Sequence, residues 1–256
     1  MTKFKAASTH LLISFFIVAC VLTTMYLLWY PNAYFALMGG KKLVMVLACV
    51  DVLLGPLLTF IVFKSGKKYL GFDLFCIAVV QMMALSYGVY VMFESRPVFT
   101  VFNKDKFQIS AVVDISTEEL GKAKNPLWRK LSITGPELVA IGVPDKKDRR
   151  DTMFANLESL NAYRYPRLYD NYQKHVQEVI KSGKPLPILY EVKAENKAAV
   201  DTFIKNRNRP ESDFLYLPIT SELASMSVMV DAKTGEFIEI IDSTEELDKK
   251  IHSTPF

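Results

Sequence analysis

The chain has 256 residues, of which 50% are apolar, and its 31 lysines and arginines exceed its 27 aspartates and glutamates. The excess is confined to the first part: eight basic and three acidic residues precede Pro97, whereas 23 basic and 24 acidic residues follow from there. A nucleic-acid-binding domain needs a basic face on its folded part, so the composition argues against nucleic acid as a partner.

Three apolar runs lie in the first 96 residues, at about 11–30, 43–63 and 74–93. Each has the roughly 20 residues that a helix needs to cross a hydrocarbon core of about 30 Å. Residues 1–96 are therefore predicted to form a three-helix transmembrane anchor. A cleaved signal peptide has a shorter apolar core. A lipoprotein signal ending at Cys20 is the alternative, but its cleavage would leave an apolar N-terminus.

The lysines between these runs predict an orientation. Two lysines precede the first run, two lie between the first and second runs, and three follow the second. Because basic residues are enriched in short cytoplasmic loops, we expect a cytoplasmic N-terminus. Three crossings then place everything after Pro97 in the periplasm of a bacterium, with the anchor in the inner membrane.

Residues 97–256 carry alternating short strand and helix signals, which predict one periplasmic α+β domain. Ser116 and Glu119 have the spacing of a capping box, and a turn containing Gly235 joins the two runs of the clearest hairpin. Strands or extended segments are expected at 97–102, 106–115, 131–143, 186–192, 214–220, 225–230 and 237–242. Helices are expected at 116–120, 145–160, 168–180 and 196–206.

No motif in the sequence indicates catalysis or a bound cofactor. The histidines at positions 10, 175 and 252 lack nearby residues at metal-ligand spacing. There is no nucleophile elbow and no glycine-rich phosphate-binding loop. We therefore predict that the protein is not an enzyme and uses no metal or cofactor.

The stretch "NAYRYPRLYDNY", residues 161–172, is the candidate periplasmic interface. Tyrosine and arginine are enriched at the centres of protein interfaces. The alternative is that tyrosines at this spacing are half-buried core residues. The candidate residues are Tyr163, Arg164, Tyr165, Arg167, Tyr169 and Tyr172.

Asp51 stands alone inside the second apolar run. A charged residue at mid-bilayer costs about 2.5–3.5 kcal/mol on insertion scales, so we expect this side chain to point into the bundle. Gly55 and Pro56, one turn on, should loosen the helix and free a carbonyl near the same layer. Counting along each run places Asp51 level with other polar residues. These candidate partners are Thr23, Thr24, Ser86 and Tyr87, with Gln81 about one turn deeper.

Three hypotheses for Asp51 remain open. It can form an internal hydrogen bond that fixes helix pairing, it can dock the transmembrane helix of a partner, or it can relay protons. A relay is disfavoured because no Lys, Arg or His is expected at its depth.

Several ordered segments make a family resemblance specific. They include "KFKAASTHLLIS", "WYPNAYF", "VDVLLGPLLTFIVFKSGKK", "ALSYG" and "RPVFTVFNKDKF". Over residues 1–115 the chain resembles the type IV pilin accessory protein family (TfpX/TfpZ). The resemblance implies an inner-membrane protein that binds and stabilises a cognate type IV pilin and assists its assembly into pili. The implied partners are the major pilin, other pilus assembly components and the lipid bilayer.

A different class of function is also compatible with the sequence, namely a membrane-anchored periplasmic sensor or a small transport component. A sensor would need a cytoplasmic output domain, whereas the predicted cytoplasmic parts are a short N-terminus and one short loop. A transporter would want more spans or paired intramembrane charges.

Overall fold

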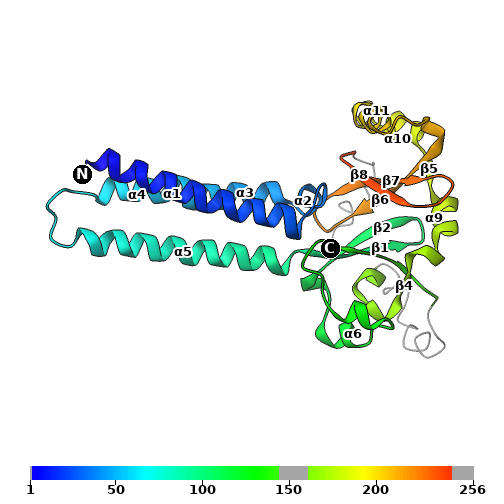
Figure 1. Cartoon of the computed structure of the whole chain (residues 1–256), viewed down its shortest axis with the longest axis horizontal. Coiled ribbons are helices and arrows are strands. Elements are labelled where there is room, and N and C mark those ends of the chain that lie inside the picture. Colours follow the sequence, from blue (N-terminus) through cyan, green and yellow to red (C-terminus); the bar gives the residue numbers. More distant parts are fainter. Residues whose placement is uncertain (1, 144–160, 244–256) are drawn as a thin grey trace, which may run out of the picture. The chain divides into compact units, whose positions relative to one another are not determined.

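The computed structural model describes residues 2–143 and 161–243. By its internal contacts the chain separates into two units, Met1–Arg96 and Pro97–Phe256. The first unit is helical and the second is built on a curled mixed sheet (Figure 1). This architecture confirms the predicted class of a membrane-anchored α+β protein.

The first unit contains three helices that are long and apolar enough to cross a membrane: Lys3–Trp29, Gly40–Val62 and Leu70–Glu94. Each begins three to eight residues before the predicted apolar run. The first comprises α1 (Lys3–Thr24) and a π-helical segment, Met25–Trp29; the second comprises α3 (Gly40–Leu47), a π-helical segment, Ala48–Leu54, and α4 (Gly55–Val62). The third is α5 (Leu70–Glu94), and the short α2 (Tyr34–Leu37) lies between the first two.

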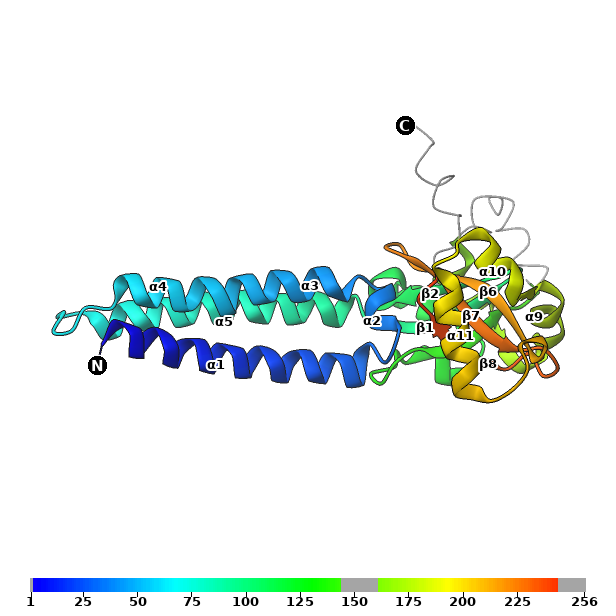
Figure 2. The same cartoon turned by 90° about the horizontal axis from the view of Figure 1, so that it is seen from above.

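The three long helices lie side by side, as Figures 1 and 2 show from two directions. Both α1 and α5 pack against the second span and make fewer contacts with each other. Large apolar side chains point outward; Phe16, for example, is 69% exposed. Such an outward apolar surface is what a helix surrounded by lipid requires.

Where the structure describes the second unit, eight strands form one sheet in the order β4-β3-β1-β2-β6-β7-β8, with β5 paired to β6. Two neighbouring pairs, β1 with β3 and β2 with β6, are parallel, and the other pairs are antiparallel. The strands are β1 (Pro97–Asn103), β2 (Lys106–Ala111), β3 (Glu137–Ile141), β4 (Tyr169–Asn171), β5 (Lys184–Pro185), β6 (Phe214–Thr220), β7 (Ser225–Asp231) and β8 (Phe237–Ile241).

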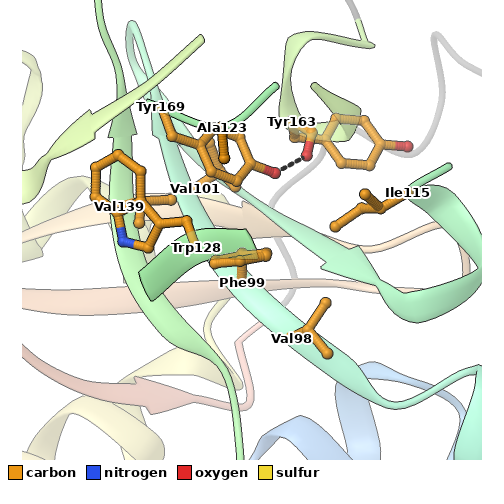
Figure 3. Close-up of a cluster of buried hydrophobic side chains, with 9 residues drawn as sticks. All are labelled: Val98, Phe99, Val101, Ile115, Ala123, Trp128, Val139, Tyr163 and Tyr169. Atoms are coloured by element: carbon orange, nitrogen blue, oxygen red, sulfur yellow. Dashed lines mark hydrogen bonds between the residues drawn. The ribbon is translucent and has the colours of Figure 1, made fainter. Parts of the chain in front are cut away.

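Two buried clusters form the core of this unit. The first gathers side chains from β1, β3 and β4 around Phe99, Trp128 and Tyr169 (Figure 3). The second joins β6, β7 and β8 to two helices and includes Phe203 and Phe214, whose rings lie 4.9 Å apart. The α-helices in the described residues of the unit are α6 (Thr117–Gly121), α9 (Val176–Ser182), α10 (Leu186–Val192) and α11 (Asn196–Arg207).

Several predicted elements are confirmed. The strands at 97–102 and 214–220, the helix at 196–206 and the hairpin of β7 and β8 all form. In the turn of this hairpin Gly235 has a φ of +67°, a conformation that favours glycine. At the start of α6 the Ser116 hydroxyl accepts a hydrogen bond of 3.2 Å from the backbone N–H of Glu119.

Other predicted elements are wrong in whole or part. Residues 186–192, expected as a strand, form α10, because Leu186 and Leu189 are both buried and their spacing of three fits a helix. Pro187 in its first turn also suits a helix start. The helix expected over 168–180 is α-helical only from Val176, since the preceding residues pair as β4 and form tight turns.

Two further expectations need qualification. The extended segment expected over 131–143 is a strand only at Glu137–Ile141, after a turn in which Gly135 has a φ of +83°. The helix expected over 145–160 lies outside the described residues.

Candidate functional site

Asp51 lies at the middle of the second long helix, Gly40–Val62, within the π-helical segment Ala48–Leu54. Its side chain is turned inward, and the residue is only 4% exposed. An acid that would be costly against acyl chains is thereby kept away from them. π-Helical turns are rare and occur frequently at functional sites.

The proline after this segment explains how the backbone near Asp51 is arranged. Pro56 has no backbone N–H, and in a π-turn its partner would be the carbonyl five residues earlier, that of Asp51. The side chain of Gln81 on α5 supplies a donor instead, with Nε2 at 3.2 Å from this oxygen. Gly55 permits the approach, because a Cβ at that position would lie 1.9 Å from Gln81 Nε2.

A second polar contact joins α1 to α4. Nδ1 of His10 lies 2.6 Å from the hydroxyl of Thr59, a residue that is almost fully buried. The two helix pairings are thus held by His10 with Thr59 and by Gln81 with a backbone carbonyl. Within the described part of the chain, Oδ2 of Asp51 and Oε1 of Gln81 are buried without a hydrogen-bond partner.

The side chains of Asp51 and Gln81 line an open pocket of about 170 Å³, although the two unpaired oxygens themselves have almost no accessible surface. One wall comes from α1, the other from α5, and Asp51 comes from the helix against which both pack. A cavity of roughly 150 Å³ accommodates a benzene-sized group. We call this pocket the Asp51 groove; the residues used below are His10, Ser14, Ile17, Asp51, Gln81 and Met82.

The expected partners of Asp51 are mostly elsewhere. Thr23, Thr24, Ser86 and Tyr87 are exposed on the outer surfaces of their helices, and Thr24 donates to the carbonyl of Cys20 in its own helix. Of the expected set, Gln81 alone lines the groove. The second helix begins at Gly40, three residues before the predicted run, which puts Asp51 about 4.5 Å further along the helix axis.

His10, which was not among the predicted site residues, lines the same groove as Asp51. His10 bonds to Thr59, which lies eight residues and about 12 Å beyond Asp51 along the helix, so the expectation that no Lys, Arg or His lies at the depth of Asp51 is not contradicted. A signal was available: His10, Ser14 and Ile17 have the i, i+4, i+7 spacing of one helix face, and two of them are polar within an apolar run.

In the sheet unit, the structure corrects the candidate interface at three tyrosines. Tyr163, Tyr169 and Tyr172 are buried, the second of them 99% so. The Tyr169 hydroxyl donates to the carbonyl of Tyr163 (Figure 3), and that of Tyr172 donates to the carbonyl of Gly235 at 2.6 Å. Burial raises the pKa of both hydroxyls, which keeps them protonated as donors. These side chains belong to the core, the alternative that the sequence left open.

The remaining members of that set are partly exposed and engaged with neighbours. Arg164 pairs with Glu222 and lies 3.4 Å from Asp114. Burial raises the pKa of Asp114, although the backbone N–H of Ala111 and the charge of Arg164 oppose this effect. Arg167 donates to Glu119 at 2.7 Å and lies over the ring of Tyr165.

Two exposed apolar side chains flank the ion pairs of Arg164. Val113 precedes Asp114, Leu223 follows Glu222, and these two apolar residues are 71% and 64% exposed. We call them the outer apolar pair. The sequence did not single them out, because Val113 lies within the predicted strand 106–115 and Leu223 stands between Glu222 and Ala224.

The structure gives no sign of a metal centre where it describes the chain. Residues 2–143 and 161–243 contain no group of three or more His, Cys, Asp or Glu side chains arranged to hold a metal ion. Three apolar helices with an inward-facing acid, followed by a mixed-sheet unit, define a membrane-anchored α+β protein.

Sequence similarity to curated proteins of Dichelobacter nodosus identifies a family within this class. The chain is 29% identical to the fimbrial assembly protein of serogroup E1 and 28% identical to that of serogroup I, in both cases over 88% of this chain and 89% of the relative. It is 36% identical to the fimbrial assembly protein of serogroups C1 and C2, over 46% of this chain and 92% of that protein. The chain belongs to this fimbrial assembly protein family. No family model and no solved structure matches it.

Proposed function

We propose that this chain is an inner-membrane accessory protein of the TfpX/TfpZ type, which binds and stabilises a cognate type IV pilin and assists its assembly into pili. Its relatives are named fimbrial assembly proteins, which supports a role in pilus biogenesis. Such a role requires binding surfaces and no catalytic step. A pilin subunit has a long apolar helix and a globular head, so a helper needs one surface within the membrane and one outside it.

The intramembrane half of this proposal, contact with the apolar helix of the pilin, rests on the unpaired acid in the Asp51 groove. Had Asp51 served only to fix helix pairing, its side chain would be expected to bond across the bundle. His10 with Thr59 and Gln81 with a backbone carbonyl already make those pairings. Because the Asp51 side chain lines the groove, a rotation of its carboxyl group would present the unpaired Oδ2 to a helix from another protein.

For the contact with the pilin head we propose the outer apolar pair, Val113 and Leu223. Exposed apolar side chains next to a charged network are a common composition of a transient interface. The tyrosines first considered for this role lie in the core, so they support the surface without forming it.

The proposed orientation has a cytoplasmic N-terminus and a periplasmic sheet unit, as the lysine distribution predicts. A test is alkaline phosphatase fused after residue 103, compared with a fusion in the loop at residues 64–69. The proposal expects activity from the first fusion and none from the second. The reverse result would contradict it.

The intramembrane half is tested with Asp51→Leu in a piliated host. We expect co-purification of the major pilin with the tagged protein to fall at least about threefold, the scale of an interhelical hydrogen bond in a membrane. Leu54→Ala, on an exposed position of the same segment, is the matched control and should leave the yield unchanged. Unchanged pilin abundance and co-purification in Asp51→Leu would refute this half.

The outer half is tested with the double variant Val113→Asp plus Leu223→Asp, alongside a stop codon placed after Pro97. Both should reduce surface piliation while leaving the chain in the membrane. Leu127→Asp, at another exposed apolar position, is the control for added charge. A truncated chain that still supports normal piliation would show that the outer unit is dispensable.

A transport component is the second candidate, because His10 places a titratable base on the same groove as Asp51. A transport role predicts that Asp51→Asn abolishes proton flux into proteoliposomes and leaves pilin abundance unaffected. The accessory role predicts no such flux in the wild-type protein.

A further inference from the structure

We infer that the Asp51 groove accepts a transmembrane helix that carries a hydrogen-bond donor side chain near the middle of its span. The inference rests on the proposed function for the identity of the natural partner, a pilin, and adds the chemistry by which that partner is recognised. The groove recognises the partner through a hydrogen bond from its donor side chain as well as through apolar packing.

Where the structure describes the chain, two acceptor oxygens of groove side chains lack hydrogen-bond partners. Oδ2 of Asp51 and Oε1 of Gln81 lack partners among the described residues, while Nε2 of Gln81 is already committed to a backbone carbonyl. Nδ1 of His10 is likewise engaged with Thr59. Buried unsatisfied acceptors are costly in a low-dielectric environment, so an incoming donor relieves a penalty that the free protein carries.

The dimensions of the groove suit one side chain of a helix. Its volume of about 170 Å³ exceeds that of a benzene-sized cavity and can hold a single long or ring-shaped side chain. The walls contributed by Ile17 and Met82 are apolar, so they suit the hydrocarbon part of such a side chain. The acid supplies the polar end of the site.

A lipid acyl chain would cover the apolar walls and leave both acceptors unpaired, which makes it the poorer occupant. A second copy of this chain could present Tyr87 or Ser86 from its own outer surface. We commit to a partner helix bearing a donor, and self-association is treated as an outcome of the test.

The test uses the full-length protein in liposomes and two synthetic transmembrane peptides. Both are leucine-rich helices of about 22 residues, a length that spans the bilayer, and they differ at one central position, Lys in the first and Leu in the second. Binding is measured by energy transfer between labelled peptide and labelled protein. We expect the Lys peptide to bind about 3-fold to about 20-fold more tightly than the Leu peptide.

Variants of the protein identify the side chain that causes the preference for the Lys peptide. Asp51→Leu should abolish it, and Asp51→Asn, which keeps one acceptor oxygen and the shape, should reduce it. Tyr87→Leu, on the lipid-facing side of α5, is the matched control and should leave it intact. The comparison of two peptides on the wild-type protein needs no variant, so a folding defect in Asp51→Leu does not obscure the result.

Three results would overturn the inference. The two peptides could bind wild-type protein equally, or the Lys preference could survive in Asp51→Leu. Purified wild-type protein could also form a dimer in liposomes that Asp51→Leu separates, which would assign the groove to a second copy.

Failure here is distinguishable from failure of the proposed function. If the pilin co-purifies in an Asp51-dependent way while the peptides bind equally, the accessory role stands and donor recognition is wrong. If the Lys peptide is preferred while no pilin co-purifies, the groove chemistry stands and the pilin assignment fails.

Discussion

The two units of the chain distribute their apolar side chains in opposite ways. In the helical unit large apolar residues such as Leu12, Phe16 and Leu27 point outward, whereas in the sheet unit Phe99, Phe214 and their neighbours are fully enclosed. Each arrangement suits a different solvent, lipid for the first and water for the second. The contrast supports two environments for one chain without reference to any motif.

The buried polar groups of the two units differ in kind. In the sheet unit the buried hydroxyls of Tyr169 and Tyr172 donate to backbone carbonyls within the unit. In the helical unit Asp51, the acid at the centre of a span, keeps an oxygen without a partner among the described residues. Buried hydroxyls without a hydrogen-bond partner also occur in the described part of the sheet unit, at Ser227 and Ser243, so the helical unit differs in that its unpaired group is an acid within a spanning helix.

The largest expected effect comes from opening the sheet core. Phe99→Ala removes a buried ring that lies 5.1 Å from that of Tyr169, and we expect the free energy of unfolding to fall by about 3–5 kcal/mol. In a Trp29→Phe background the fluorescence of Trp128 reports on this unit during denaturant unfolding. Phe16→Ala, which removes an outward-facing ring from the helical unit, should leave that transition unchanged. Equal effects of the two substitutions on the unfolding transition would contradict this difference between the two units.

Membrane insertion, in contrast, should depend on outward-facing residues of the helical unit and not on exposed residues of the sheet unit. Phe16→Asp places a charge on the lipid-facing surface and should raise the insertion free energy of the first span by about 2.5–3.5 kcal/mol. A translocon insertion assay measures this directly. Leu127→Asp, at an exposed position of the sheet unit, should leave insertion unaffected, and a similar loss at both positions would count against lipid burial of α1.

The architecture could largely be predicted from the sequence because apolar runs of spanning length and alternating strands are strong local signals. The hairpin around Gly235 and the strand beginning at Pro97 follow from such signals. The residues at 186–192 could not be assigned, because a short apolar run suits a strand or a helix until its packing against β6 is known.

The site was harder to predict than the fold. Asp51 was identified because a lone acid in a spanning helix is unusual, and Gln81 was placed near it. The positions of His10, Thr23 and Ser86 depend on the relative shift of the helices. That shift is set by where each helix begins and by the π-helical turn, and hydropathy does not reveal either feature.

Unfolding at low pH should test how the sheet unit stabilises the ionised side chain of Asp231. Burial alone would raise the pKa of Asp231, but the N–H groups of Thr234 and Lys233 and the Arg209 guanidinium lower this pKa to about 2. An aspartate in the unfolded chain has a pKa of about 3.9. The stabilisation that ionised Asp231 provides is therefore complete above that pH and is lost as the pH falls toward 2.

The expected result is a melting temperature of the sheet unit that declines between about pH 4 and pH 2, followed by Trp128 fluorescence. Asp231→Asn should flatten this decline, at the cost of lower stability at neutral pH. A slope unaltered by Asp231→Asn would assign the acid sensitivity to other groups.

The smallest expected effect concerns helix capping. Ser116→Ala removes the acceptor for the N–H of Glu119 at the start of α6 and should cost about 1 kcal/mol of sheet-unit stability in denaturant unfolding. Thr2→Ala removes the corresponding cap of α1, where the hydroxyl accepts from the N–H of Lys5. It should leave the sheet transition unchanged, and a shift there would show that the units unfold together.

Site-specific photocrosslinking inside living cells tests the central claim most directly. A photoreactive residue replaces Ile17 on the wall of the Asp51 groove or, as the comparison, Phe16 on the neighbouring outward face. We expect an adduct with the major pilin from position 17 that is lost in Asp51→Leu, and lipid adducts from position 16. Pilin adducts from position 16 alone, or from neither position, would contradict it.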